Sequence, residues 1–408
     1  MVSKEIDFKD FIRQELEKIF GSKGWSPIIA GILIGLVNIV SYVWVKKPFT
    51  VYTGFLNWGQ HIYSLIGLSS IAGAPKLTPL LEPTSVGDIG TIIGAMIAAS
   101  LANEFAIRRI SNKVEVFEAI AGGVLMALGA SLAFGCNWGG FLSAITSWSL
   151  HGFAFLVGAL IGGYLGLKYV TWKAEKIMKE LEIEIVGSSG EEFTQILSVS
   201  KARKSLGKYM ALAVAIVMLT LLIVYYASIG SPMVGELFIG ITIGILIQRA
   251  RFCFATAFRD LFNGPENARA LDIHKGIAIA ILVGSTGVFA LKFMGMVEED
   301  IGVAPVHITN TVGGLLFTFG SVLAGGCASG ILWRTGEGHI KAWIALLTTV
   351  LAYPIFFRLI RPYVAGNPRI FIPYSIGWIQ AFIFMIIFIT LYILSICYLE
   401  YKYRYRSR

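Results

Sequence analysis

The feature that most constrains this chain is a series of long apolar segments, each close to the length that crosses a bilayer. About 20 helical residues cover the roughly 30 Å of hydrocarbon in a membrane. The mean hydropathy of +0.72 is far above what a soluble core needs. The sequence therefore predicts an all-α, polytopic membrane protein with about nine or ten transmembrane helices. The predicted spans lie near 26–45, 87–107, 117–135, 152–170, 209–228, 234–248, 273–294, 311–326, 339–360 and 374–398.

Shorter apolar pieces lie between these spans, near 54–72, 138–148, 252–262 and 328–335. They are too short, or too interrupted by glycine and polar residues, to cross. A bilayer tolerates such half-helices only where protein or a water-filled cavity surrounds them. We therefore expect short re-entrant segments beside the full spans.

Two glycine-rich segments share one layout and indicate an internal repeat. Gly122 and Gly123 precede Cys136 in "LMALGASLAFGCNWGG" (125–140) at the spacing with which Gly313 and Gly314 precede Cys327 in "FTFGSVLAGGCASG" (317–330). Along the series of predicted spans, the span at 26–45 corresponds to the span at 234–248, five crossings later. Because five is an odd number, the second copy would have the opposite orientation in the membrane. Two inverted repeats with discontinuous helices are typical of secondary transporters. An alternative is that the small residues only let helices pack closely.

The basic residues predict the orientation and the limits of the parts. Lys and Arg number 34 against 25 acidic residues, for a net charge of +9, and they flank apolar runs, which indicates topology rather than nucleic-acid binding. We expect a multi-pass protein of the cell (inner) membrane with both termini cytoplasmic, and a rim of Lys46, Lys47, Arg358, Arg361 and Arg369 outside. The expected parts are a cytoplasmic amphipathic segment (1–25), a first membrane repeat (26–170), a polar cytoplasmic linker (171–208), a second repeat with its preceding span (209–360), and a C-terminal span with a basic tail (361–408).

The repeated segments present glycine, cysteine and small polar residues where a span ends. A helix that unwinds there frees backbone N–H groups at the start of the next half-helix, and such a site attracts anions. The candidate pathway residues are Gly135, Cys136 and Asn137 in the first copy and Gly325, Gly326, Cys327 and Ser329 in the second.

A third cysteine, Cys253, lies in "QRARFCFATAFRD" (248–260), where it shares a helical face with Arg259. Its counterpart in the first copy, counted from matching glycines, is Trp44. Apolar surroundings keep a thiol uncharged, and its soft sulfur suits a sulfur-bearing anion. We therefore expect neutral thiols to pass such an anion inward. Glu337 is expected to pair with Arg334.

The four cysteines form no CxxC pair, so neither a metal nor a cofactor is expected. A membrane thiol oxidoreductase and a soft-metal permease stay open as alternatives, the first requiring a redox-linked cysteine pair. No nucleophile–base constellation indicates an enzyme.

The GC steps, together with "RFCFATAFRD" and the two-half organisation, resemble the YeeE/YedE family of sulfur-compound transporters. The resemblance covers about 26–360. It implies uptake of thiosulfate along the pore-lining cysteines Cys136, Cys327 and Cys253, with a small cytoplasmic sulfur-carrier protein of the TusA type as partner. Some relatives are associated with selenium metabolism, which leaves selenium compounds as an alternative substrate.

Overall fold

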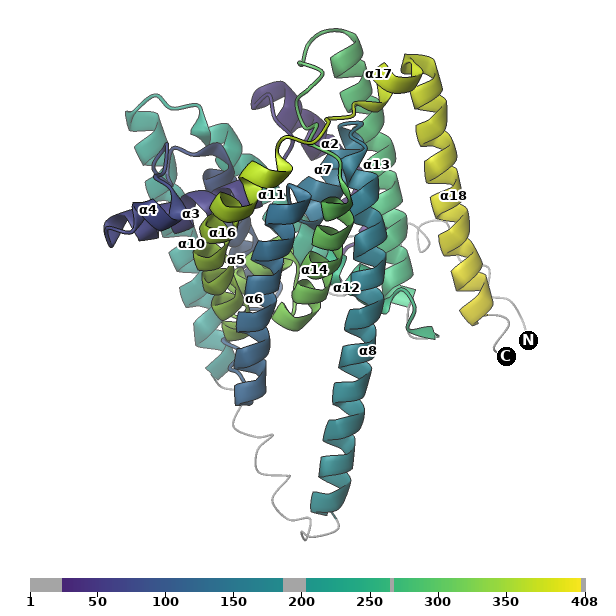
Figure 1. Cartoon of the computed structure of the whole chain (residues 1–408). Helices are drawn as coiled ribbons and strands as arrows, with labels where there is room; N and C mark the ends of the chain where they lie inside the picture. Colours follow the sequence, from purple (N-terminus) through teal and green to yellow (C-terminus); the bar gives the residue numbers. More distant parts are fainter. Residues whose placement is uncertain (1–23, 186–202, 265–267, 405–408) are drawn as a thin grey trace, which may run out of the picture.

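The computed structural model describes residues 24–185, 203–264 and 268–404, which form a bundle of long helices (Figure 1). Ten helical segments among these residues are long and apolar enough to cross a membrane, which confirms the predicted spans. The described residues form no β-strands, and their only β-structure is a few isolated bridges between loops. The long helices are α2 (Pro27–Trp44), α5 (Pro83–Leu101), α6 (Lys113–Ala133), α8 (His151–Ile185), α10 (Arg203–Ser228), α11 (Met233–Arg249), α13 (Ala268–Phe293), α14 (Ile308–Ala324), α16 (Ile340–Val364) and α18 (Trp378–Arg404).

The predicted half-helices are also present. They are α3 (Tyr52–Leu65) with α4 (Ser69–Ala72), η1 (Asn137–Leu142) with α7 (Ser143–Thr146), α12 (Phe254–Asp260) and α15 (Ala328–Gly336), while a short α17 (Ile372–Ile376) precedes α18. Nearly all of the predicted amphipathic segment 1–25 lies outside the described residues, as do the middle of the predicted linker and the end of the basic tail.

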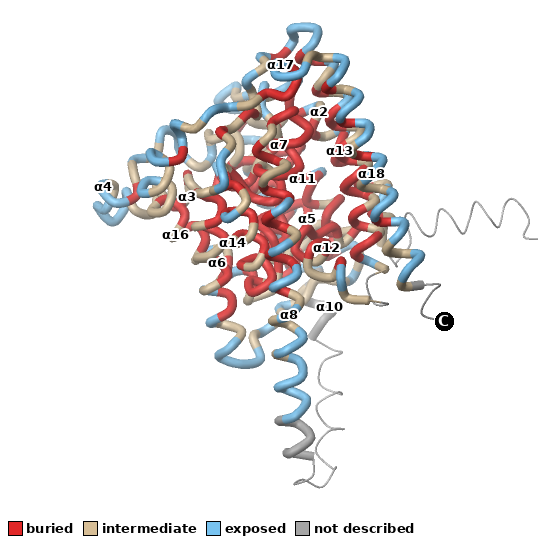
Figure 2. The backbone as a smooth tube through the Cα atoms, turned by 45° about the vertical axis from the view of Figure 1, so that its right-hand side comes forward, coloured by how far each residue is buried: buried red, intermediate tan, exposed pale blue. Residues whose placement is uncertain are grey.

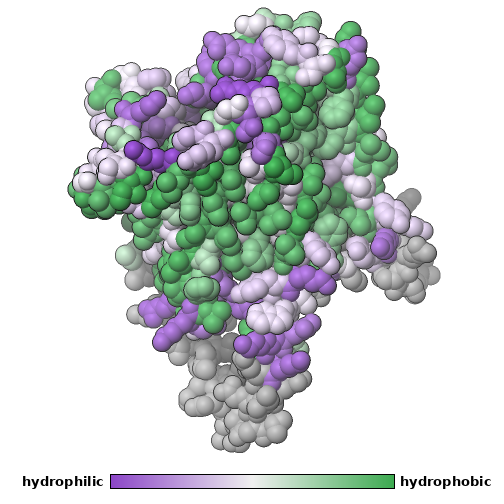
Figure 3. Space-filling model, viewed as in Figure 1, coloured by the Kyte–Doolittle hydropathy of each residue, from purple (hydrophilic) through white to green (hydrophobic). Residues whose placement is uncertain are grey.

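On the face shown in Figure 3, apolar side chains cover the middle of the molecule, and hydrophilic side chains gather above and below them. The buried backbone lies at the centre of the bundle, and the exposed backbone lies at its margins (Figure 2). Helices α10 and α18 are the least buried of the spans, each with 17% of its most apolar window inside the protein. Their outward Leu, Ile and Val side chains therefore face the surroundings that a lipid would fill.

Helices α6 and α14 cross at the centre through two pairs of glycines. A Cβ atom added to Gly122 would lie 2.6 Å from the carbonyl oxygen of Gly320, and one added to Gly129 would lie 2.6 Å from that of Gly313. Small residues allow this backbone approach. The repeat matches Gly122 with Gly313 and Gly129 with Gly320. An approximate two-fold axis between the repeats therefore converts the Gly122–Gly320 contact into the Gly313–Gly129 contact.

The outer helix pairs follow the same symmetry. An added Cβ on Gly31 of α2 would lie 2.1 Å from the carbonyl oxygen of Gly276 on α13, and one on Gly240 of α11 would lie 2.1 Å from that of Gly87 on α5. The α2–α13 pair therefore corresponds to the α11–α5 pair. These pairings agree with the predicted inverted repeats.

The two ends of the bundle carry different groups. At one end, here called the linker face, the segments 102–112, 249–251 and 336–340 meet, as in the bond from the Arg108 amide to the Gly338 oxygen at 2.9 Å. At the other end, the vestibule face, the segments 45–51, 294–307 and 365–371 meet, as in the bond from the Val306 amide to the Pro368 oxygen at 2.9 Å. Arg108, Arg249 and Arg251, which are among the basic residues predicted to share one side of the membrane, lie on the linker face.

Candidate anion pathway

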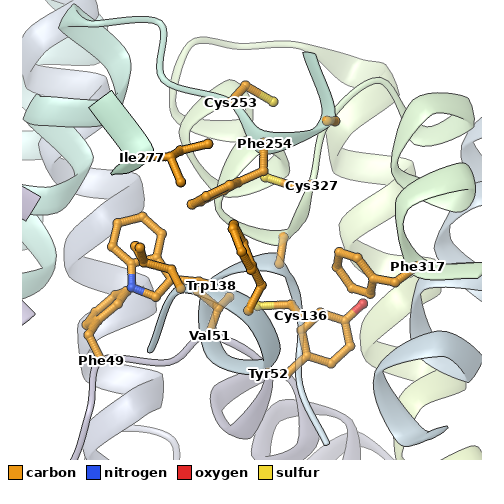
Figure 4. Packing of buried hydrophobic residues seen from close by; sticks show 14 of the residues in the cluster. Phe49, Val51, Tyr52, Cys136, Trp138, Cys253, Phe254, Ile277, Phe317 and Cys327 are labelled. Atoms are coloured by element: carbon orange, nitrogen blue, oxygen red, sulfur yellow. The ribbon is translucent and has the colours of Figure 1, made fainter. Parts of the chain in front are cut away.

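Three of the four cysteines begin half-helices at the centre of the protein. Cys136 is the N-cap of η1, Cys253 of α12 and Cys327 of α15, and each has an extended backbone there. All three are 1% exposed and belong to one apolar core. Figure 4 shows Cys253, Cys327 and Cys136 in order from the top to the bottom of the view. The fourth, Cys397, is exposed on α18.

The turns before Cys136 and Cys327 use left-handed backbone to end the preceding span. Helix α6 ends at Phe134 with φ 61°, and α14 ends at Gly325 with φ 81°. Glycine adopts this conformation without a Cβ penalty, whereas phenylalanine does so at a cost. Gly135 is also confined, because an added Cβ would lie 2.6 Å from the Gly140 nitrogen. The glycines selected from the sequence thus shape the two breaks.

The thiols of Cys253 and Cys327 face each other across Gly330. A Cβ atom added to Gly330 would lie 3.1 Å from the Cys253 sulfur and 3.4 Å from the Cys327 sulfur. The Ser329 hydroxyl is 3.5 Å from the Cys327 sulfur. Glycine at position 330 therefore keeps open a small space that both sulfurs border.

The counterpart of Cys253 in the first repeat is Val51, which corrects the prediction of Trp44. Val51 is the N-cap of α3, as Cys253 is of α12, and it lies near Cys136 in Figure 4. Trp44 is 62% exposed at the end of α2. The glycine-based count missed this because the connection between α2 and α3 is longer than that between α11 and α12.

Aromatic rings surround the thiols. Tyr52 lies beside Cys136 in Figure 4, and its ring is 5.5 Å from that of Phe317 and 4.6 Å from that of Tyr353. On the other side, the Trp138 ring is 6.0 Å from the Phe254 ring, which lies near Cys327. The three buried thiols are thus packed among aromatic side chains.

Several hydrogen-bond donors in this region are buried without a partner in the described part of the chain. Buried donors in proteins are nearly always hydrogen-bonded, so each such group needs an explanation. The donors are Asn137 Nδ2, Trp138 Nε1, Trp333 Nε1 and Arg334 Nε. The Asn137 side-chain oxygen accepts from Thr318 at 3.4 Å, which leaves its amide nitrogen as the free end.

On the linker-face side of Cys253 and Cys327, two arginines lie over the Trp333 ring. The guanidinium carbons of Arg251 and Arg334 are 5.2 Å and 5.0 Å from its centre. Such cation–π contacts hold a charge in place without neutralising it. Arg334 therefore brings a positive charge one helical turn from Gly330.

Glu337 does not pair with Arg334, contrary to the sequence-based expectation. Its fully buried carboxylate is 2.7 Å from Arg251 Nη1 and 3.4 Å from Arg108 Nη1, and it accepts from Gln248 at 2.8 Å. Burial alone would raise the pKa of Glu337, but the hydrogen bond from His339, the charge of Arg251 and the bond from Gln248 hold that pKa below its ordinary value. Because residue 337 follows the last turn of α15, its carboxylate turns toward neighbouring loops rather than back along the helix.

Arg259, the remaining selected residue, makes a bidentate ion pair with its neighbour Asp260, at 2.5 Å and 2.6 Å. The pair sits at the end of α12, whose first residue follows Cys253. The guanidinium donors on the Asp260 side are thus occupied.

A pocket of about 360 Å³ opens on the vestibule face. Phe49 and Thr50 line it, and the Phe49 ring is 5.2 Å from the Trp138 ring. An added Cβ on Gly139 would lie 3.2 Å from Thr50 Cγ2. The pocket therefore rests on η1, the helix that Cys136 begins. Its lining residues are Ser41, Val45, Lys47, Pro48, Phe49, Thr50, Thr53, Glu82, Pro83, Thr84, Glu236, Ile301 and Gly302.

The structure thus brings Cys136, Cys253 and Cys327 together with Asn137, Ser329 and the glycines of the breaks, while Arg259 lies at the far end of its short helix. Trp138 and Trp333 were not among the residues predicted from the sequence, and Arg334 was expected only to pair with Glu337. Trp138 and Trp333 follow Cys136 and Cys327 closely in the chain, so their positions in the repeated segments were the available signal.

Comparison with known proteins gives three kinds of match. A family model described as "Sulphur transport" matches residues 4–165 and 249–406. "Probable transporter YedE" of Salmonella typhimurium is 30% identical over 353 residues, which cover 83% of this chain and 84% of that protein. "Thiosulfate transporter TsuA" of Escherichia coli is 38% identical over 137 residues, 33% of this chain and 36% of that protein. The protein of the same name from Spirochaeta thermophila is 36% identical over 112 residues, 27% of this chain and 32% of that protein.

Proposed function

The chain belongs to the sulphur transport family, and on this premise we propose that it takes up thiosulfate, passing the anion from thiol to thiol across the membrane. The relatives named as thiosulfate transporters support this choice among sulfur-containing anions. The protein itself acts as a transporter and not as an enzyme.

The observation that carries the proposal is the meeting of three buried cysteines with unpartnered donors. Thiosulfate combines a soft terminal sulfur with charged oxygens. The sulfurs of Cys136, Cys253 and Cys327 suit the soft end, because sulfur is polarizable and an uncharged thiol does not repel an anion. The free donors of Asn137 and Trp138 suit the oxygens.

The proposed route begins in the pocket on the vestibule face, whose Lys47 attracts the anion. Rotation of the Phe49 and Trp138 rings admits it to Cys136, where the first-turn amides of η1 have no partner within the helix. The anion then reaches the space bordered by Cys327, Cys253 and Gly330. Gly135, Gly325 and Gly326 keep the breaks narrow, and Ser329 supplies a hydroxyl beside Cys327.

At the linker face the route ends among cations. Arg334 binds the anion on the linker-face side of Cys253. Arg259 adds positive charge at the end of α12, and Asp260 neutralises part of that charge. We propose that this face is cytoplasmic, with both termini on that side, and that a small sulfur-carrier protein of the TusA type collects the sulfur there.

The test is uptake of ³⁵S-thiosulfate by proteoliposomes that contain the full chain. We expect uptake by the wild type, and a loss of at least about tenfold for Cys136→Ala, Cys253→Ala or Cys327→Ala, because each removes the sulfur contact and leaves a gap. The matched control is Cys397→Ala, which removes the exposed cysteine of α18 and should transport normally.

Thiosulfate uptake at the wild-type rate by all three buried-cysteine variants would rule out the thiol pathway. Parallel assays with sulfate and selenite separate thiosulfate from its competitors, since neither offers a terminal sulfur. A Cys253–Cys327 disulfide that forms and reduces during turnover would instead favour the oxidoreductase alternative, because the two thiols border one space.

A further inference from the structure

The pocket on the vestibule face carries more negative than positive groups, which is unexpected where an anion enters. Glu82 and Glu236 line it, and Lys47 is the only basic residue among its lining residues. A third carboxyl, Asp88, lies behind the pocket on α5. Carboxylates facing a dianion would repel it unless they bind protons.

Glu236 is almost fully enclosed although it lines the pocket. It lies in the first turn of α11, is 5% exposed, and its Oε1 atom has no hydrogen-bond partner among the described residues. Lys47, the basic residue of the pocket, is exposed, and no ion pair joins it to Glu236 within the part of the chain that the structure describes. The start of α11 and the charge of Lys47 favour the carboxylate, but the burial of Glu236 and the missing partner of Oε1 oppose it.

Asp88 is more isolated still. It is fully buried, and neither of its carboxylate oxygens has a hydrogen-bond partner in the described chain. A Cβ added to Gly54 of α3 would lie 2.2 Å from Asp88 Oδ2, so the carboxyl is covered by the α3 backbone. The neighbouring residue Thr53 lines the pocket, and Cys136 on the inner side lies within electrostatic range of Asp88.

On the basis of the proposed function, we propose that Asp88 and Glu236 are a proton-binding pair that moves protons inward together with the anion. The two carboxyls lie on the two helices of the tight α5–α11 contact, with Glu236 in the wall of the pocket and Asp88 behind it against Gly54. The titratable or charged groups acting on it are Glu82 at the start of α5, Lys47 from the α2–α3 connection and Cys136 from the turn after α6.

The coupling follows from charge. A dianion near Cys136 strengthens proton binding by a neighbouring carboxyl, and by thermodynamic linkage a bound proton strengthens anion binding by the same factor. A membrane potential that is negative inside opposes the entry of a dianion, and accompanying protons cancel that opposition. A metal cation is a poorer fit, because no group of three His, Cys, Asp or Glu within the described residues is arranged to hold one.

The experiment measures protons and anion together in wild-type proteoliposomes loaded with a pH-sensitive dye. Addition of external ³⁵S-thiosulfate should acidify the interior as the label enters. An acidic external pH should raise accumulation several-fold at a clamped membrane potential, and a protonophore should abolish that increase.

Asp88→Asn and Glu236→Gln keep the shape of the protonated side chains but cannot exchange a proton. We expect both variants to lose the stimulation by the pH gradient and the internal acidification. Asp272→Asn is the matched control, because this carboxyl is exposed on the linker-face end of α13 and should leave both signals unchanged.

The outcomes separate the two proposals. Thiosulfate entry without proton movement in the wild type, or stimulation by a sodium gradient instead, overturns the proton pair and leaves the proposed function intact. Absence of thiosulfate entry in the wild type overturns the proposed function itself. The wild-type measurement decides these points even if a variant fails to fold.

Discussion

At the scale of single residues, the notable choice is cysteine at the start of three half-helices. Ser, Thr, Asp and Asn are the preferred N-caps, because their oxygens accept bonds from first-turn amides. None of the three thiols makes such a capping bond. Helix capping alone would favour serine or aspartate at these positions, so the choice of cysteine supports the proposed role of the sulfurs in the pathway.

Gly330→Ala tests the space between two of the thiols. The added methyl would lie 3.1 Å from the Cys253 sulfur and 3.4 Å from the Cys327 sulfur, in the space through which the proposed pathway runs. Overfilling a packed interior costs about 1–3 kcal/mol, so we expect ³⁵S-thiosulfate uptake in proteoliposomes to fall about five- to hundredfold.

Gly207→Ala on α10 is the control for this substitution, since nothing lies within 4 Å of its added Cβ. It should transport at the wild-type rate. Normal uptake by Gly330→Ala would mean that the anion does not use the space beside Gly330.

At the scale of the elements, sequence reasoning located both kinds of helix but not all of their contacts. The long spans and the half-helices are predictable because apolar length and interruption are local properties of the chain. The approach of Cys253 to Cys327 is not, since it depends on how α12 and α15 meet in space. The assignment of Trp44 failed for a related reason, because a connection of different length shifted the register and hid Val51.

The glycine crossing of α6 and α14 gives a prediction about stability. In Gly122→Ala, the new methyl would lie 2.5 Å from the Ala324 nitrogen and 2.6 Å from the Gly320 oxygen. Backbone cannot yield as a flexible side chain can, so the helices must separate. We expect a thermal midpoint in detergent that is several degrees below that of the wild type, corresponding to about 1–3 kcal/mol.

The matched comparison is again Gly207→Ala, because both substitutions replace a helical glycine and gain about 1 kcal/mol of helix propensity. The difference between the two variants therefore isolates the crossing. If Gly122→Ala were as stable as Gly207→Ala, the close approach of α6 and α14 would be absent from the folded protein.

At the scale of the whole molecule, the inverted repeat gives both faces a similar framework but different chemistry. The linker face carries the ion-pair group of Glu104, Arg249, Arg251 and Glu337. The vestibule face carries the pocket with Glu82 and Glu236. The sequence pattern predicts this separation of basic segments, but it does not reveal that Glu236 lines a pocket or that Asp88 is buried against Gly54 of α3, because both depend on contacts between helices.

The orientation of the molecule can be tested on one residue from each face. In a Cys397→Ala background, the remaining native cysteines are 1% exposed and should not react with a membrane-impermeant maleimide. Glu298→Cys then reports on the vestibule face and Lys113→Cys on the linker face, and both positions are exposed. Because Arg108, Arg249 and Arg251 lie on the linker face, the positive-inside rule predicts that this face is cytoplasmic.

We therefore expect intact cells to label Glu298→Cys, and to label Lys113→Cys only after the membrane is opened. The background variant without an added cysteine should stay unlabelled in both conditions. The reverse pattern would put the pocket in the cytoplasm, and the carboxyls of Asp88 and Glu236 would then stand at the exit of an uptake route. Protons bound there would no longer enter with the anion, so this one measurement also bears on the direction of coupling.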